Sequence, residues 1–148
     1  MAASPPSAFA VASYVPEWRY EGTNWETLCE TVTHLILFSL EVTPDGGIAA
    51  WDRIPRAPLL QQAKVASKRT GTKLLICFGG NGRSDGFSPM VRSAAARAKF
   101  VSNLVKLCDD YGFDGVDLNW EYPGIPLPLS LSLSSSLSLP LSLFACLN

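Results

Sequence analysis

Four short apolar stretches, alternating with segments of helical character, limit the folds open to this chain more than any other feature of its sequence. The apolar stretches are residues 8–15, 33–42, 73–78 and 113–121. The helical segments between them are residues 24–32, 58–70 and 93–111. Strands and helices that alternate in this order are typical of parallel sheets whose strands are joined by helical crossovers. We therefore predict an α/β fold.

Residues that favour helix ends support these three helices. Asn24 fits an N-cap, and Pro58 fits the first turn of the second helix. Gly71 and Gly112 follow the second and third helices, where a glycine often ends a helix. On the third helix, the spacing predicts one buried apolar stripe made of Ala94, Ala98, Val101, Leu104, Val105 and Cys108.

Two α/β architectures fit this order, a doubly wound sheet and a (β/α)8 barrel cut short. Polar or glycine residues gather where the strands end: Glu17, Trp18, Gly79, Gly80, Asn119 and Glu121. Barrel enzymes place their chemistry at the carboxyl ends of their strands. A doubly wound dinucleotide-binding sheet would have G-x-G-x-x-G after its first strand, whereas this chain has YVPEWRYEG there. The barrel is therefore favoured.

The length of the chain allows only part of a barrel. A complete barrel needs eight strands and roughly 250 residues, whereas these 148 residues supply four strands. We predict a TIM barrel truncated to about its first four strands and three helices, with open edges at the first and fourth strands. Residues 1–7 are interpreted as an N-terminal extension and residues 8–124 as the barrel segment.

Residues 125–148 differ sharply in composition from the rest of the chain. They are almost entirely Leu, Ser and Pro and carry no charge. A CT dinucleotide repeat in the gene would encode alternating Leu and Ser. The tail is therefore predicted to be disordered, or to be translated simple-sequence DNA.

Composition also limits the partners of the chain. The formal net charge is −1 and no stripe of Lys and Arg is present, so neither nucleic acid nor a membrane is an expected partner. None of the four cysteines has zinc-site spacing, and buried free thiols are expected. The D-x-N-x-E run is not a calcium loop, because Tyr122 stands where that loop needs glycine. No metal and no cofactor are expected.

The stretch FDGVDLNWEYPG, residues 113–124, alternates polar and apolar side chains. In a strand Asp117, Asn119 and Glu121 would share one face, while the residues between them would form an apolar face that suits burial under a helix. A row of three polar groups beside such a face either meets solvent or points into a site.

This strand resembles the D-G-x-D-x-D-x-E signature of glycoside hydrolase family 18, the chitinases and their relatives. Here the signature is DGVDLNWE over residues 114–121, and Tyr-Pro follows it. The segment LLICFGG is similar to the family's S-x-G-G strand, with Cys77 where serine is usual. The likeness covers residues 8–124, the first half of the family's barrel.

The resemblance implies hydrolysis of β-1,4-linked N-acetylglucosamine polymers such as chitin, in which the substrate's own 2-acetamido oxygen attacks the anomeric carbon with retention. Glu121 matches the acid that protonates the leaving oxygen. Asn119 matches the residue that orients the acetamido group, and Asp117 supports it. Asp114 and Cys77 match further supporting positions. The substrate-binding residues implied are Tyr14, Trp18, Gly79, Gly80, Trp120 and Tyr122.

Asn119 departs from the family pattern, which has aspartate at this position. An amide can accept the acetamido N–H, but it has no negative charge to stabilise a positive intermediate, and such stabilisation is worth roughly 2–4 kcal/mol. A chitinase-like hydrolase is favoured by the retained Glu121, a non-catalytic chitin-binding lectin by Asn119, and an inactive truncated product by the tail. The resemblance suggests an extracellular protein, although the first fifteen residues do not resemble a secretory signal.

Overall fold

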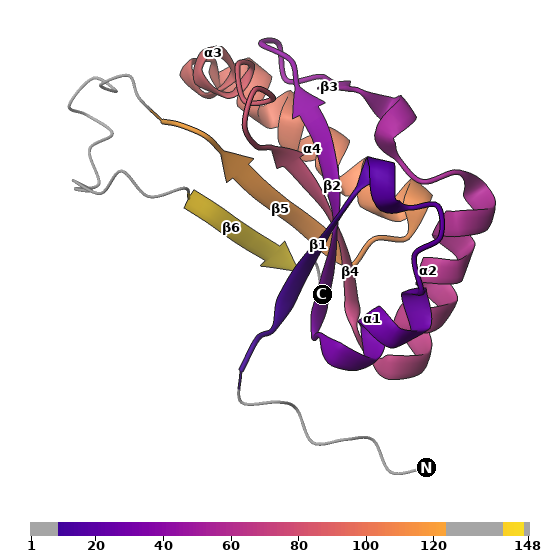
Figure 1. Ribbon diagram of the computed structural model, residues 1–148. Helices are drawn as coiled ribbons and strands as arrows, with labels where there is room; N and C mark the ends of the chain where they lie inside the picture. The colour runs from indigo at the N-terminus through magenta and orange to yellow at the C-terminus, as the bar shows by residue number, and fades with distance from the viewer. Residues whose placement is uncertain (1–8, 124–140, 147–148) are drawn as a thin grey trace.

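A computed structural model describes residues 9–123 and 141–146 of the chain and shows a twisted sheet with helices packed against it (Figure 1). Four parallel strands are neighbours in the sheet in the order β1, β2, β4, β5. Their bounds are Ala12–Pro16, His34–Val42, Lys73–Gly79 and Gly115–Trp120. This confirms the four parallel strands predicted from the sequence. A two-residue strand, β3 (Ile48–Ala49), pairs antiparallel with β2.

Helical crossovers join the parallel strands, as predicted. The helices are α1 (Trp25–Thr31), α2 (Ala57–Thr70), α3 (Phe87–Arg92) and α4 (Ala94–Tyr111), with single 3-10 turns η1 (Glu17–Arg19) and η2 (Trp51–Arg53). The sequence did not predict α3, which is short and directly precedes α4. All four helices pack on one side of the sheet (Figure 1). A doubly wound sheet would have helices on both faces, so the barrel architecture accounts better for this arrangement.

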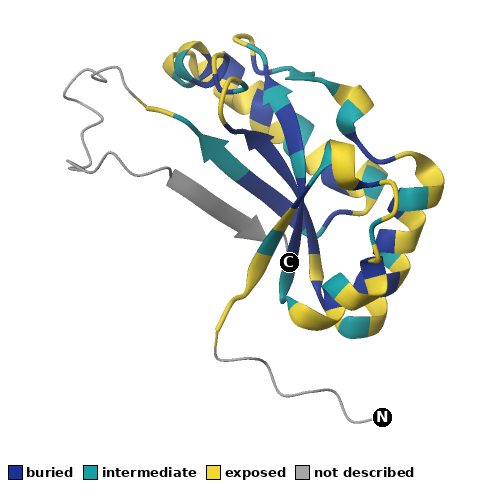
Figure 2. Ribbon diagram, in the orientation of Figure 1, coloured by how far each residue is buried: buried dark blue, intermediate teal, exposed yellow. Residues whose placement is uncertain are grey.

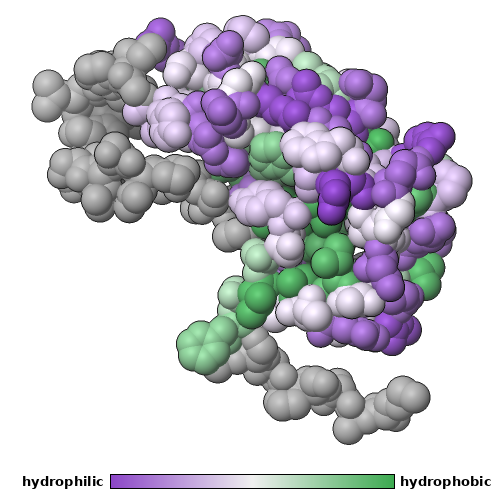
Figure 3. All heavy atoms as spheres, in the orientation of Figure 1, coloured by the Kyte–Doolittle hydropathy of each residue, from purple (hydrophilic) through white to green (hydrophobic). Residues whose placement is uncertain are grey.

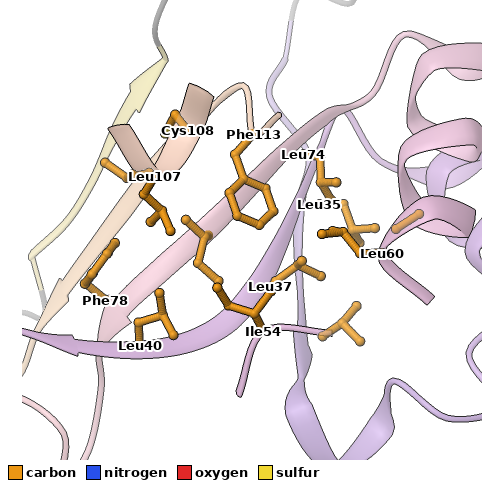
Figure 4. Packing of buried hydrophobic residues seen from close by; sticks show 14 of the residues in the cluster. Leu35, Leu37, Leu40, Ile54, Leu60, Leu74, Phe78, Leu107, Cys108 and Phe113 are labelled. Carbon is orange, nitrogen blue, oxygen red and sulfur yellow. The ribbon is translucent and has the colours of Figure 1, made fainter. Parts of the chain in front are cut away.

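The strands are buried on both faces, and their side chains alternate between two layers. Leu35, Leu37, Leu74 and Phe78 point toward the helices (Figure 4) and belong, with Ile76, to the main core. The residues between them form a smaller buried cluster on the opposite face, made of Ile36, Leu75 and Cys77. Figure 2 shows the central strands as almost continuously buried. Continuous apolar runs are what parallel strands covered on both sides require.

The predicted helix ends are confirmed. The Asn24 side chain accepts the N–H of Thr27 at 3.1 Å and caps α1. Gly71 and Gly112 end α2 and α4 with φ of 80° and 67°, a region that favours glycine.

The buried face of α4 differs from the predicted stripe. Phe100 is buried and meets the ring of Phe78 edge-on at 5.4 Å and that of Phe87 at 6.4 Å. Val101, predicted to be buried, is 59% exposed, and Val105 is also exposed. The helix is rotated so that its largest apolar side chain enters the core. The buried residues of α4 are Ala96, Phe100, Leu107 and Cys108, while Ala94 and Ala98 face outward.

Only one of the two predicted open edges is found among the described residues. The outer edge of β5 pairs antiparallel with β6 (Leu141–Cys146), with Asn119 opposite Ser142. No described strand lies beyond β1. On this side exposed apolar residues include Phe9 and Val11, and the space-filling view shows green atoms over β1 and its neighbours (Figure 3).

Six tail residues thus form a strand, and residues 124–140 and 147–148 lie outside the described part of the chain. The prediction that the tail is translated simple-sequence DNA stays a prediction. Within residues 9–123 and 141–146, no helix is both long enough and apolar enough to cross a membrane.

We expect the neighbouring positions Phe100 and Val101 to differ strongly in their contribution to stability. Phe100→Ala should lower the free energy of unfolding by about 3–5 kcal/mol, because it removes a buried aromatic ring from contact with two others. Val101→Ala, the matched control on the exposed side, should change it by less than about 0.5 kcal/mol. Urea unfolding of the three chains measures both values. Equal losses at the two positions would contradict the observed orientation of α4.

Candidate active site

The candidate site lies on the face of the sheet opposite the helices, at the carboxyl ends of the strands. β5 sends Asp117 and Asn119 to this face. Its alternate residues Val116, Leu118 and Trp120 belong to the core on the helix side. Parallel register places Cys77 beside Asp117 and Gly79 beside Asn119, so β4 and β5 build the site together.

Asp117 is the most deeply buried polar group of the site. It is 0% exposed, and the hydroxyl of Tyr14 on β1 donates to its Oδ2 at 2.9 Å across 103 residues of sequence. Burial raises the pKa of Asp117 above its ordinary value, and hydrogen bonds from Cys77 and Tyr14 partly oppose that rise. Burial and the neighbouring Asp117 charge also raise the pKa of the Cys77 thiol, so Cys77 stays neutral. Asp117 and Cys77 together therefore carry at most one negative charge beneath the site.

Asn119 lies next to a hollow with aromatic walls. The hollow has a volume of about 280 Å³ and is lined by Tyr14, Pro16, Trp18, Phe38 and Asn119. The Tyr14 and Phe38 rings meet edge-on at 6.0 Å, and Trp18 is 66% exposed at the rim. Asn119 Oδ1 is buried and has no hydrogen-bond partner among the described residues. Aromatic faces beside an amide oxygen without a partner can bind a ring whose substituent donates an N–H group.

Glu121 is the first residue beyond β5, and its side chain is half-buried. Its backbone N–H donates to Ser84 Oγ at 3.1 Å. Among the described residues, no hydrogen bond or ion pair holds its carboxyl group. Tyr122, which follows, is largely exposed. The Glu121 carboxyl can therefore reach a molecule bound at the strand ends.

Gly79 and Gly80 shape the site by having no side chains. Their φ values are 92° and 98°. A Cβ on Gly79 would lie 2.3 Å from the carbonyl oxygen of Asn119, and one on Gly80 would lie 2.5 Å from the ring of Phe38. The N–H of Gly80 donates to Asn119 O at 2.7 Å. Only glycine lets this loop come so close to the end of β5.

A charged group beside the hollow was not found by sequence reasoning. Arg83 pairs with Glu17 at 2.7 Å, donates to Ser39 Oγ at 3.1 Å, and lies 5.2 Å from the centre of the Phe38 ring. Ser39 in turn donates to Gly79 O at 2.7 Å. Glu17 directly follows β1, but Ser39 lies within β2 and Arg83 within the loop after β4, so position relative to a strand end does not single out Arg83.

Two predicted site residues lie elsewhere. Trp120 was expected to bind substrate, but it stacks on Phe87 at 5.6 Å on the helix side, because its place in the strand alternates with those of Asn119 and Glu121. Asp114 lies at the opposite end of β5, where its carboxylate accepts the N–H of Leu74 at 2.8 Å. Asp114 therefore joins β5 to β4 far from the hollow.

The part of the chain that the structure describes contains no group of three or more His, Cys, Asp or Glu side chains arranged to hold a metal ion. The thiols of Cys29, Cys77 and Cys108 are free and buried. The residues gathered at the strand ends are one carboxyl, one amide, one buried acid and several aromatic rings. This set suits a site in which the carboxyl donates a proton, or one in which the aromatic faces bind a ring of a ligand.

Parallel strands, helices on one side and polar groups at the strand ends define this chain as part of a (β/α)8 barrel with its site at the usual end. The model of the family "Glycosyl hydrolases family 18" matches residues 10–127. The chain therefore belongs to glycoside hydrolase family 18, as the signature on β5 indicated.

Relatives and solved structures agree with this assignment. Chitinase 1 of Aphanocladium album is 28% identical over 138 residues, which cover 79% of this chain and 33% of that protein. The crystal structure of the chitinase RmChi1 from Rhizomucor miehei superposes with a TM-score of 0.62 at 28% identity, over 78% of this chain and 34% of that one. The chain thus spans about a third of the length of these proteins.

We expect Asp117 to lower the stability of the chain as the pH rises. Its pKa in the folded chain lies above the value of about 3.9 in an unfolded one, so the folded chain binds the extra proton between these two values. Stability must then fall as the pH rises through that range. Asp117→Asn stays neutral, and the variant should be more stable than the parent at pH 7, with the difference closing below about pH 4.

Urea unfolding of parent and variant at several pH values checks this prediction. Asp114→Asn is the matched control on the same strand. It weakens the ion pair with Lys73, so it should lose stability at pH 7 and not gain it. A loss of stability at pH 7 in Asp117→Asn as well would show that the buried carboxylate is stabilising.

Proposed function

We propose that this chain provides the acid-bearing part of a chitinase-like glycoside hydrolase that cleaves β-1,4-linked N-acetylglucosamine polymers by substrate-assisted, retaining catalysis. The observation that supports this most directly is the row of Asp117, Asn119 and Glu121 at the end of β5, beside a hollow with aromatic walls. Such a row combines one half-buried acid that has no described partner with groups that can orient an acetamido group.

Glu121 is the proposed acid. In the first step the bond between the anomeric carbon and the leaving oxygen breaks, and Glu121 gives its proton to that oxygen. The acetamido oxygen of the same sugar forms a new bond to the anomeric carbon, giving a positively charged oxazolinium ring. In the second step water attacks that carbon, the bond between the carbon and the acetamido oxygen breaks, and the Glu121 carboxylate takes a proton from the attacking water. Its half-buried position with no described partner leaves the carboxyl available for both transfers.

Asn119 is proposed to accept the acetamido N–H through its Oδ1, the buried atom that lacks a partner. This would hold the acetamido oxygen toward the anomeric carbon. Asp117 lies beneath, fixed by Tyr14, and would supply the negative charge that Asn119 lacks when it is ionised. Because burial raises its pKa, Asp117 must lose its proton at a higher pH than an ordinary aspartate before it can supply that negative charge.

Trp18 and Phe38 are proposed to contact the sugar rings. The exposed Trp18 ring offers an apolar face at the rim of the hollow. A 28% identical domain, catalytic domain 2 of the Ostrinia furnacalis Group II chitinase, has been solved as a mutant in complex with (NAG)5. This supports N-acetylglucosamine oligosaccharides as the ligands of the present chain.

A second candidate function is a chitin-binding lectin without turnover. Asn119 favours it, because the missing charge weakens stabilisation of the oxazolinium but leaves the aromatic hollow intact. Cys77 in place of serine favours it too, since a buried neutral thiol is a poorer hydrogen-bond partner than a hydroxyl. Hydrolysis of a bound chitin oligomer distinguishes the two functions, because the hydrolase cleaves the oligomer and the lectin only binds it.

Glu121→Gln tests the proposed acid. A chimeric barrel, in which residues 9–123 replace the matching segment of the Rhizomucor miehei chitinase, supplies the remaining strands. The variant should lower turnover on a chitin oligomer by about 10²–10⁴-fold, because glutamine cannot give up a proton, and should keep the affinity for the oligomer. Glu41→Gln, a change at another half-buried glutamate, should keep most of the turnover. Parental turnover in Glu121→Gln would rule out Glu121 as the acid.

Asn119→Asp tests the missing charge in the same chimera. A carboxylate here would stabilise the developing oxazolinium, and turnover should rise by on the order of 10²-fold or less. The measurement is kcat on one soluble oligomer near neutral pH. An unchanged or lower kcat would mean that the site is built around the amide, and the lectin would become the better description.

A further inference from the structure

The loop that follows β4, residues 80–86, connects three strands of the site. Two consecutive side chains extend from it in different directions. Arg83 reaches Glu17 after β1 and Ser39 on β2. Ser84 reaches the end of β5, where it contacts Asn119 and Glu121. The loop therefore acts as a brace across the carboxyl ends of the strands.

Ser84 uses its hydroxyl fully. It is 6% exposed. Its Oγ accepts the N–H of Glu121 at 3.1 Å and lies 3.1 Å from Gly80 O and 3.3 Å from Asn119 O. One hydroxyl proton serves one of these two carbonyls at a time, while its lone pairs serve Glu121. The hydroxyl thus bonds the loop and the end of β5 at once.

The contact matters because Glu121 lies beyond the strand ladder. The pairing of β4 with β5 ends at Gly79 opposite Asn119. Pairing with β6 ends at Trp120. The hydrogen bond to Ser84 is therefore what holds the Glu121 N–H, at a point where a strand end would otherwise fray.

The loop itself is held firmly enough to serve as an anchor. The Arg83–Glu17 ion pair is partly buried. A Cβ on Gly86 would lie 1.7 Å from the carbonyl oxygen of Val42, so the loop's far end packs directly on the backbone after β2. Ser84 lies between these two fixed points.

We infer that Ser84 is a positioning residue for Glu121, acting through the Glu121 backbone N–H. Its effect on the site follows from geometry, since the direction of the Glu121 carboxyl is set by the backbone from which it extends. The effect on hydrolysis rests on the proposed function, whereas the effect on the backbone does not.

Residue-resolved hydrogen exchange of the 148-residue chain tests the inference without any substrate. In the parent, the Glu121 amide should exchange more slowly than in an unstructured peptide. Ser84→Ala should speed its exchange by about 10-fold, while the amides of Leu37 and Ile76 in the central strands keep their rates. Ser84→Thr retains the hydroxyl and should restore slow exchange. Ser67→Ala is the matched control, because Ser67 is equally buried but bonds only within α2.

Two results would overturn the inference. One is a Glu121 amide that already exchanges at the unstructured rate in the parent, and this result needs no variant. The other is a Ser84→Ala chain in which Glu121 is unaffected, or in which all core amides accelerate equally as in a general loss of stability.

In the chimeric barrel, Ser84→Ala should lower kcat by about 10–10²-fold and leave KM nearly unchanged, since a misplaced acid slows the chemical step more than it weakens binding. A raised KM with parental kcat would contradict a role through Glu121. If exchange at Glu121 responds as expected but every chimera is inactive, the proposed hydrolysis fails and the positioning of Glu121 by Ser84 stands.

Discussion

The register between β4 and β5 is the constraint on which the site depends. It pairs Cys77 with Asp117 and Gly79 with Asn119, and it sends Asn119 and Asp117 to the same face. A shift by one residue would exchange this face with that of Val116, Leu118 and Trp120, so that the polar row would enter the helix-side core. Burying an acid and an amide there without partners would cost several kcal/mol. The apolar packing of β5 under α3 and α4 therefore fixes the polar row on the opposite face.

Keeping Asp117 in that position has a cost that the fold offsets elsewhere. Its carboxyl is fully enclosed, and of its two oxygens only Oδ2 has a hydrogen bond of ordinary geometry, from Tyr14. Burial accordingly favours the protonated form. Groups that destabilise a fold in this way are common in functional sites. Apolar burial on the same face can offset this cost, since Ile36, Leu75 and Cys77 are fully buried there and Cys77 lies opposite Asp117.

Much of this structure could be predicted from local pattern, whereas the contacts between distant parts of the chain could not. The four strands, the caps at Asn24, Gly71 and Gly112, and the polar row on β5 follow from periodicity and residue type alone. The stripe on α4 was wrong, because helical spacing does not show that the large Phe100 ring takes precedence over Val101 in the core. Trp120, predicted to bind substrate, lies on the helix side against Phe87, as strand alternation with Asn119 requires. Ser84 and Arg83 were missed because their partners are 35–66 residues away in sequence, and no local pattern contains such contacts.

In the proposed hydrolysis, Asn119 and the brace formed by residues 80–86 would act on different parts of the same activation barrier. The amide would affect charge, since it leaves the stabilisation of a positive intermediate to Asp117 beneath it, whose pKa is raised by burial. The brace affects geometry, since Ser84 fixes the backbone from which the Glu121 carboxyl extends. The Ser84 hydroxyl bonds the Glu121 N–H directly, and the Arg83–Glu17 pair and the close approach of Gly86 to Val42 hold the loop that carries Ser84. In the proposed hydrolysis, the missing negative charge at Asn119, and not the placement of Glu121, would then be the feature that limits turnover.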